Sequence, residues 1–143
     1  MGKSMVRNLM KAGFEVSIYT RTRSKVEDVI GEGAIWCDSV AECAKGRDAV
    51  ISIVGYPKDV IEVYFGPAGI LANADPGTYV IDMTTTSPKL AVQIFDEAEK
   101  LGLHAIDAPV TGGDSGAKAG TLTILAGGKK EDFDTCMPVF EAM

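Results

Sequence analysis

Short runs rich in valine and isoleucine alternate along the chain with segments in which apolar residues recur at helical spacing. Runs of the first kind are typical of strands that are buried on both faces of a parallel sheet. The expected strands are Glu15–Thr20, Ala34–Cys37, Asp48–Val54, Thr78–Met83, His104–Asp107 and Thr121–Ala126. The alternation predicts right-handed crossovers in a doubly wound α/β fold with a mostly parallel sheet.

Several segments between these strands carry helix boundary signals. The first has an apolar stripe and a glycine stop, two others begin with Ser-x-x-Glu, and the longest begins with Ser-Pro. The apolar stripe is formed by Met5, Val6, Leu9 and Met10, and Gly13 follows it. The Ser-x-x-Glu pairs are Ser24 with Glu27 and Ser39 with Glu42. The longest helix is expected to begin at Ser87-Pro88 and to end before Gly102. A last helix is expected from Lys130.

The chain opens on an expected helix, Lys3–Ala12, with no strand before it. A doubly wound domain usually opens with its central strand and a glycine turn, and Met1-Gly2 looks like the tail of such a turn. We therefore expect a domain that lacks its first strand, and the alternative is a domain that begins with a helix. Because loss of a central parallel strand uncovers two strand edges, we expect the isolated chain to be unstable or to self-associate.

Composition narrows the class of protein. The 143 residues fit one domain, residues 1–143, and 46% hydrophobic with 24% charged residues is typical of a globular protein. A net charge of -6 argues against nucleic-acid or anionic-membrane binding. No apolar run reaches the ~18 residues that cross a bilayer, and no signal peptide is visible, so we expect a cytoplasmic protein. The three cysteines lack metal-ligand spacing and there is one histidine, so we expect reduced thiols and no metal site.

Thr20-Arg21-Thr22 directly follows an expected strand. In a dinucleotide-binding fold, the end of the second strand meets the adenosine ribose, where an acidic residue would bind the 2′-hydroxyl. Here Thr20 occupies the position of the acid, and Arg21 offers a guanidinium, whose fork of donors suits a 2′-phosphate. The segment therefore favours NADP, with NAD possible. The alternative interpretation is a solvated basic turn.

Two further strand ends lead into helices. Val54 and Gly55 end one strand, and the glycine would let a ligand approach the backbone; an ordinary turn is the alternative. Asp82 is followed by three threonines, of which Thr85 is the candidate ligand contact, whereas Ser87 is expected to cap the next helix.

The segment Asp107–Leu122 contains a cluster of glycines between two strands. Exposed backbone N–H groups and the hydroxyl of Thr111 suit a carboxylate or phosphate, and a flexible connection is the alternative. Lys118 lies in the same segment, where a solvated side chain is the ordinary outcome. His104 has no obvious partner, so we expect a surface or packing role for it.

These residues resemble the β-hydroxyacid dehydrogenase family, which includes 3-hydroxyisobutyrate dehydrogenase and glyoxylate/succinic semialdehyde reductase and is related to 6-phosphogluconate dehydrogenase. The resemblance is carried by Gly2 before a helix, Tyr19–Thr22, Asp82–Thr85, and Asp107–Gly113 through Gly120–Leu122. It covers essentially the whole chain. It implies a Rossmann-type NAD(P)-binding domain.

The resemblance also implies roles for single residues. The cofactor contacts would be Gly2 at the pyrophosphate, Thr20, Arg21 and Thr22 around the 2′-phosphate of NADP, Val54 and Gly55 beside the adenosine, and Thr85 near the nicotinamide ribose. The substrate carboxylate would meet Thr111, Gly112 and Gly113. The substrate would then be a small carboxylate, either a β-hydroxy acid or a semialdehyde acid.

Two departures from the family pattern matter. The first strand is absent, and so is the helical C-terminal domain that carries the family's catalytic lysine and forms its homodimers. Hydride transfer to a carbonyl needs a proton donor, and no residue here matches that role, so we expect the isolated chain to be inactive. The alternative function is a non-catalytic nucleotide-binding or protein-interaction module of the same fold.

Overall fold

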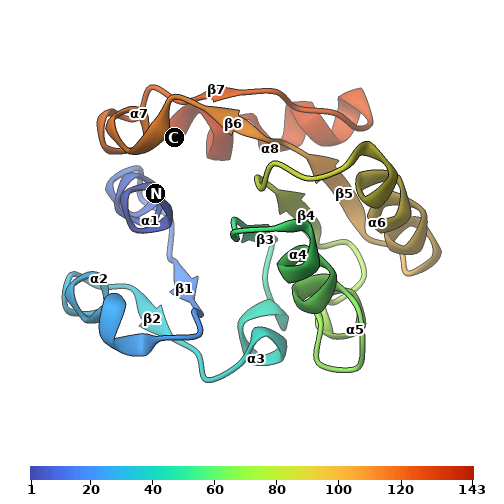
Figure 1. The fold of residues 1–143 in the computed structure, drawn as a ribbon, viewed down its shortest axis with the longest axis horizontal. Helices are drawn as coiled ribbons and strands as arrows, with labels where there is room; N and C mark the ends of the chain where they lie inside the picture. The colour runs from blue at the N-terminus through green and yellow to red at the C-terminus, as the bar shows by residue number, and fades with distance from the viewer.

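The computed structural model describes residues 1–143, in which helices and strands alternate along the chain (Figure 1). The helices are α1 (Gly2–Lys11), α2 (Glu27–Gly31), α3 (Val40–Ala44), α4 (Pro57–Tyr64), α5 (Ile70–Asn73), α6 (Pro88–Lys100), α7 (Gly113–Ala119) and α8 (Lys130–Ala142), with a 3-10 turn η1 (Arg23–Lys25). The strands are β1 (Ser17–Ile18), β2 (Ile35–Trp36), β3 (Ala49–Ser52), β4 (Tyr79–Asp82), β5 (His104–Asp107), β6 (Val110–Thr111) and β7 (Thr123–Ile124). The expected α/β class is confirmed.

The parallel strands form two separate ladders. β3, β4 and β5 pair in that order, and the register sets Ser52 opposite Asp82 and Asp82 opposite Asp107. β1 and β2 form a second parallel pair, while β6 and β7 pair antiparallel. The carboxyl ends of β3, β4 and β5 therefore finish at one level, which is the feature that positions the site.

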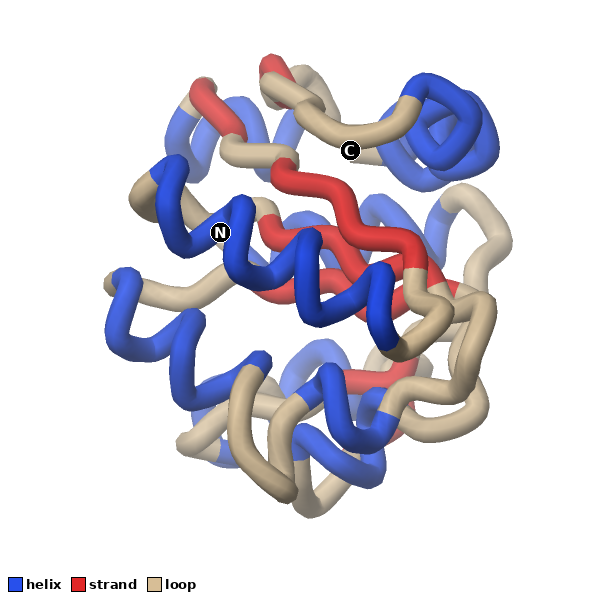
Figure 2. The backbone as a smooth tube through the Cα atoms, turned by 90° about the vertical axis from the view of Figure 1, so that its right-hand side faces the viewer, coloured by secondary structure: helices blue, strands red, loops and turns tan.

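The two faces of the β3–β4–β5 sheet carry two separate apolar clusters. Val80 and Ala105 pack with residues of α4, α5 and α6, whereas Ile81 and Ile106 pack with residues of α1, α7 and α8. Alternate residues of a strand point to opposite faces, so each strand contributes to both clusters. Figure 2 shows α1 lying along the strands.

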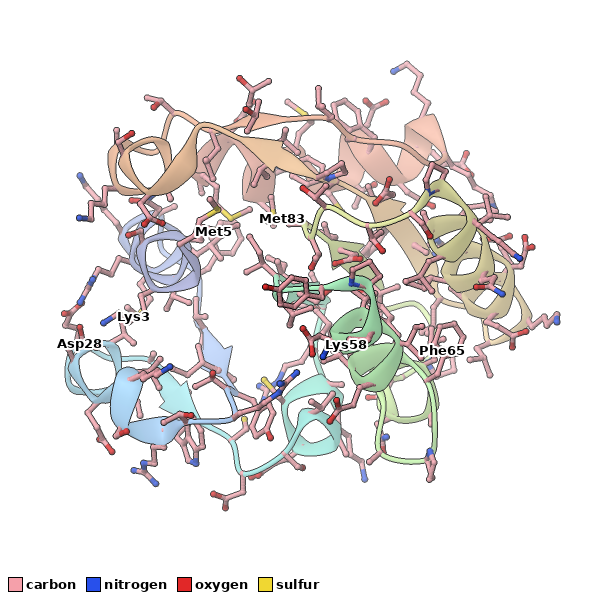
Figure 3. The ribbon with its side chains drawn as sticks, in the orientation of Figure 1. Lys3, Met5, Asp28, Lys58, Phe65 and Met83 are labelled. Atoms are coloured by element: carbon pink, nitrogen blue, oxygen red, sulfur yellow. The ribbon has the colours of Figure 1, made fainter.

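Helix α1 connects the β1–β2 pair to the rest of the molecule. Met5 of α1 and Met83, which follows β4, point toward one another and belong to the same buried cluster (Figure 3). On the side of α2, Lys3 Nζ donates to Asp28 Oδ2 at 2.9 Å. Arg7 also bonds Asp28. The apolar stripe expected in this helix is confirmed, and Gly13 follows it with a φ of 97°.

Two expectations about local structure were wrong. Ser24 does not cap a helix: it lies inside η1, α2 begins only at Glu27, and the Glu27 carboxylate pairs with Arg23. The glycine-rich segment, for which a flexible connection was the alternative, contains β6 and α7, which meet at Gly112 and Gly113. The last expected strand is short and antiparallel, so it extends no parallel ladder.

Other boundary signals hold. Ser39 Oγ accepts from the Glu42 N–H at 3.0 Å, and Ser87 Oγ accepts from the Leu90 N–H at 3.2 Å, so both serines cap helices as expected. Gly102 follows α6 with a φ of 72°. None of the helices is both long and apolar enough to cross a membrane.

The open strand edges generate a prediction. β1 pairs only with β2, and β3 pairs on one side only, with β4. Unpaired parallel edges expose backbone groups to other chains, so we expect the 143-residue chain alone to self-associate or to unfold without a cooperative transition. Light scattering after size exclusion and chemical denaturation measure this. A monomer with cooperative unfolding and an ordinary stability of about 5–15 kcal/mol would contradict it.

Candidate functional site

Buried hydrogen bonds tie the carboxyl ends of β3 and β4 together. The Val54 N–H donates to Thr84 Oγ1 at 3.0 Å. Below it, Asp82 Oδ1 accepts from Ser52 Oγ at 3.0 Å and from the Thr84 N–H at 3.1 Å. Because Ser52, Asp82 and Thr84 are all buried, these bonds fix the path of both loops as they leave the sheet.

Helix α4 is anchored to the same network through Tyr64. The Tyr64 hydroxyl and Ser52 Oγ lie 2.8 Å apart, and the tyrosine is fully buried. Burial raises the pKa of the Tyr64 phenol, which therefore keeps its proton at neutral pH. Because Tyr64 is the last residue of α4, this contact holds the C-terminal end of the helix against β3.

Arg21 reaches from the end of β1 to the start of α4. Its Nη2 donates to Asp59 Oδ1 at 2.6 Å, while its side chain stays 64% exposed, so the remaining N–H groups face solvent. Thr22 is the residue before η1, and Thr20 is half-buried. The structure thus brings the end of β1 to the loop after β3, although β1 and β3 share no ladder.

Gly55 lies exposed above Asp59. A Cβ at this position would stand 3.4 Å from Asp59 Oδ2, which is van der Waals contact. The same Oδ2 accepts from the Tyr56 N–H at 3.0 Å. Asp59 thus fixes the turn that contains Gly55 through Oδ2, and it holds Arg21 through Oδ1.

The three threonines after β4 have different surroundings. Thr84 is buried and structural, Thr85 is exposed, and Thr86 Oγ1 is buried with no hydrogen-bond partner. The exposure of Thr85 suits the ligand contact expected from the sequence. The unpartnered Thr86 hydroxyl is a second polar group at the same place, which sequence reasoning did not single out.

The turn between β6 and α7 is exposed at Thr111, Gly112 and Gly113. Both glycines have positive φ, 133° and 61°, and a Cβ on Gly112 would lie 3.2 Å from the Leu122 side chain. Glycine is therefore required at Gly112 by backbone conformation as well as by space. The turn is thus exposed to solvent, as a carboxylate site needs.

Contacts between α7 and α1 place this turn near the start of α1. Asn8 Nδ2 donates to the Ala117 carbonyl at 2.7 Å, and the Met1 amino group lies 3.3 Å from Asp114 Oδ1. On the opposite side of α1, a Cβ on Gly2 would stand 3.6 Å from Ile53 Cγ2. The first N–H groups of a helix have no partner within the helix and attract anions.

The candidate residues therefore gather at the carboxyl end of the strands, without all touching one another. A hydrogen bond joins Val54 to Thr84, which directly precedes Thr85. Another joins Arg21 to Asp59, which follows Gly55 by four residues. No hydrogen bond or ion pair joins Arg21 to the Thr111–Gly113 turn. These two groups stand at the β1 side and the β6 side of the site.

Two side chains with clear roles were missed or misjudged. Asp59 was not singled out, although an acid three residues after Tyr56, in the first turn of a helix, is a recognisable capping signal. His104 was expected to have a surface or packing role, and the sequence did not reveal its partner: its Nδ1 lies 3.0 Å from Oδ1 of the buried Asp132. The His104 ring also stacks on Tyr79, with centroids 4.5 Å apart.

Two buried carboxyl groups line a separate cavity of about 250 Å³, between α6 and the ends of β4 and β5. Asp82 Oδ2 and Asp107 Oδ1 are both buried without a partner. Burial raises the pKa of Asp82, and burial together with the Asp82 charge raises the pKa of Asp107. This cavity, and a second of about 410 Å³ lined by Phe14 and Thr78, contain none of the candidate cofactor residues.

Comparison with known proteins gives a consistent result. Residues 1–143 match the family described as the NAD binding domain of 6-phosphogluconate dehydrogenase. The chain is 52% identical over 143 residues to the oxidoreductase YkwC of Bacillus subtilis, covering 100% of the chain and 50% of that protein.

Solved structures agree. The 3-hydroxyisobutyrate dehydrogenase of Mycobacterium tuberculosis with L-serine is 31% identical, with a TM-score of 0.93 over 100% of this chain and 48% of that one. Psf3 in complex with NADP+ and 2-OPP is 27% identical, with a TM-score of 0.94 over 99% of this chain and 50% of that one. The chain thus spans about half the length of these relatives.

The buried carboxyl pair generates a prediction about pH. A carboxyl whose pKa is raised by folding stabilises the folded state below its unfolded pKa of about 4, and this contribution is lost as pH rises through the folded-state value. Asp82→Asn keeps an oxygen for Ser52 and Thr84 and removes the buried charge. We expect it to raise the free energy of unfolding at pH 7 by about 1 kcal/mol and to have little effect near pH 4.

Urea unfolding of the longer protein that would carry this domain, at several pH values, measures this difference. Asp96→Asn, which neutralises an exposed carboxyl on α6, is the control and should shift neither value. If Asp82→Asn destabilised the protein more at pH 7 than near pH 4, the ionised carboxylate would stabilise the fold and the expectation would be contradicted.

Proposed function

The chain belongs to the family of NAD-binding domains of 6-phosphogluconate dehydrogenase, and from this premise we propose that it binds NADP in preference to NAD. The oxidoreductase that carries it would interconvert a small β-hydroxy acid, or a semialdehyde acid, and its carbonyl partner. One observation carries the proposal. The ends of β1, β3 and β4 are joined by the Arg21–Asp59 and Val54–Thr84 hydrogen bonds into one polar site.

The residues present fit a dinucleotide. Gly2 lies at the start of α1, where a Cβ would be in ordinary van der Waals contact with the Ile53 side chain at 3.6 Å. That helix start offers free N–H groups to a pyrophosphate. The exposed Gly55 leaves the backbone accessible, and the exposed Thr85 offers a hydroxyl to the cofactor.

The preference for NADP is supported by the end of β1. Thr20 stands where an acid would hydrogen-bond the ribose 2′-hydroxyl of NAD. Arg21 follows, and its exposed guanidinium keeps N–H groups free for a 2′-phosphate after one bond to Asp59. The solved relative Psf3 holds NADP+, which agrees with this assignment.

The substrate class is supported by the turn between β6 and α7. Thr111, Gly112 and Gly113 are exposed, and they direct a hydroxyl and backbone groups outward near the start of α1. Donors in this arrangement suit a carboxylate. When bound, a nicotinamide cofactor supplies or accepts a hydride; the residues of this chain would bind and orient the two reactants.

The proton that accompanies hydride transfer needs a separate donor. None of the residues at the strand ends matches that role: Asp82 is buried below the surface and Asp59 is paired with Arg21. We therefore propose that residues 1–143 bind the reactants but do not turn them over. Activity is expected only from the longer protein that carries this domain.

Replacement of Arg21 tests the cofactor preference. We expect Arg21→Ala to weaken NADPH binding about tenfold or more, because a charge-assisted contact to the 2′-phosphate is lost, and to change NADH binding little. Fluorescence titration of the protein that carries this domain measures both constants. Arg23→Ala, which removes a neighbouring guanidinium that lies over Trp36, is the matched control. An equal loss for NADPH and NADH would show that Arg21 does not read the phosphate.

Replacement of Thr111 tests the substrate class. Thr111→Val keeps the shape of the side chain and removes its hydroxyl, so we expect the KM for a β-hydroxy acid to rise roughly fivefold to tenfold, with NADPH affinity unchanged. Initial rates over a panel of short β-hydroxy and semialdehyde acids measure this. If the unaltered protein bound NADPH but oxidised or reduced none of the panel, the non-catalytic module would be the better description.

A further inference from the structure

We propose that Asp59 sets how strongly this site distinguishes a 2′-phosphorylated dinucleotide from an unphosphorylated one, by partly neutralising Arg21. The inference rests on the proposed function, because it concerns the same nucleotide site. Asp59 lies in the first turn of α4 and comes from a part of the chain remote from Arg21.

Both carboxylate oxygens of Asp59 accept a hydrogen bond. Oδ1 accepts from Arg21 Nη2 at 2.6 Å, and Oδ2 accepts from the Tyr56 N–H at 3.0 Å. The Asp59 side chain is only 9% exposed, whereas that of Arg21 is 64% exposed. The carboxylate is therefore held by two hydrogen bonds, whereas most of the guanidinium side chain is open to solvent, which leaves its other donors accessible to a ligand.

No other charged side chain near Arg21 is held as firmly as Asp59. Glu62 Oε2 lies 3.9 Å from Arg21 Nη2, but its side chain is 75% exposed and free to move away. Lys58 is the other nearby cation, and its Nζ lies over the Tyr56 ring, 5.9 Å from the centroid. The hydrogen bond from Arg21 holds the pKa of Asp59 below its usual value, so the carboxylate is ionised at neutral pH.

A fixed carboxylate beside Arg21 has a definite electrostatic consequence. A 2′-phosphate that binds the outer donors of Arg21 brings a second negative group to a guanidinium that is already paired. Repulsion between this phosphate and the buried Asp59 charge opposes part of the attraction. NADH carries no phosphate at this position and does not experience this repulsion. Asp59 therefore lowers the preference for NADPH that Arg21 creates.

The test compares two dissociation constants in the same preparation. In the protein that carries this domain, we expect Asp59→Asn to raise the ratio of the NADH constant to the NADPH constant about fivefold, the scale of a partly exposed ion pair. Asn retains an oxygen for the Tyr56 N–H, and a thermal melt checks that the variant is folded. Glu62→Gln removes a nearby but mobile carboxylate and should change the ratio less than twofold.

Arg21→Ala separates an effect on the phosphate from a general structural effect. In the Arg21→Ala background, Asp59→Asn should raise the ratio clearly less than in the unaltered protein, because the phosphate is then no longer held beside Asp59. The inference is overturned if Asp59→Asn lowers the ratio, which would make Asp59 a positioning residue for Arg21. It is also overturned if the ratio stays constant, or rises equally without Arg21. If the unaltered protein bound neither dinucleotide, the proposed function itself would fail.

Discussion

The register of three parallel strands is the constraint on which the site depends. Ser52, Asp82 and Asp107 lie at matching positions of β3, β4 and β5, so the strands finish at one level and their loops leave the sheet together. A parallel sheet places every carboxyl end at the same edge. The buried bonds that Asp82 accepts from Ser52 and Thr84 then fix the first residues of two of these loops.

Charge at the site is arranged in two separate layers. Near the surface, Arg21 and Asp59 pair across the space between two ladders that share no hydrogen bonds, so an ion pair replaces backbone pairing as the link there. Deeper in the molecule, Asp82 and Asp107 face each other without a counter-charge, and burial raises the pKa of both. The exposed guanidinium of Arg21 suits an anionic ligand. The environment of Asp82 and Asp107, by contrast, disfavours ionisation of their carboxyl groups.

The sequence predicts much of this architecture because the strongest signals are local. Valine- and isoleucine-rich runs marked β3 and β4, and serine caps marked the starts of α3 and α6. Failures came where tertiary contacts decide. Ser24 has a capping pattern, yet Glu27 pairs with Arg23 and a 3-10 turn forms instead. Glycines suggested a loop where α7 packs on α1, and the bond from Arg21 to Asp59 joins residues that are 38 positions apart in the chain.

Hydrogen exchange in the presence of NADPH tests the central claim most directly, because it locates the ligand without relying on any substitution. The account predicts slower exchange of backbone amides at the start of α1, in residues 20–22, and in the loops 53–56 and 83–86. Amides near Thr78, at the opposite end of the sheet, should exchange at unchanged rates. Protection confined to that opposite end, or to the cavity beside α6, would contradict the placement of the dinucleotide at the strand ends.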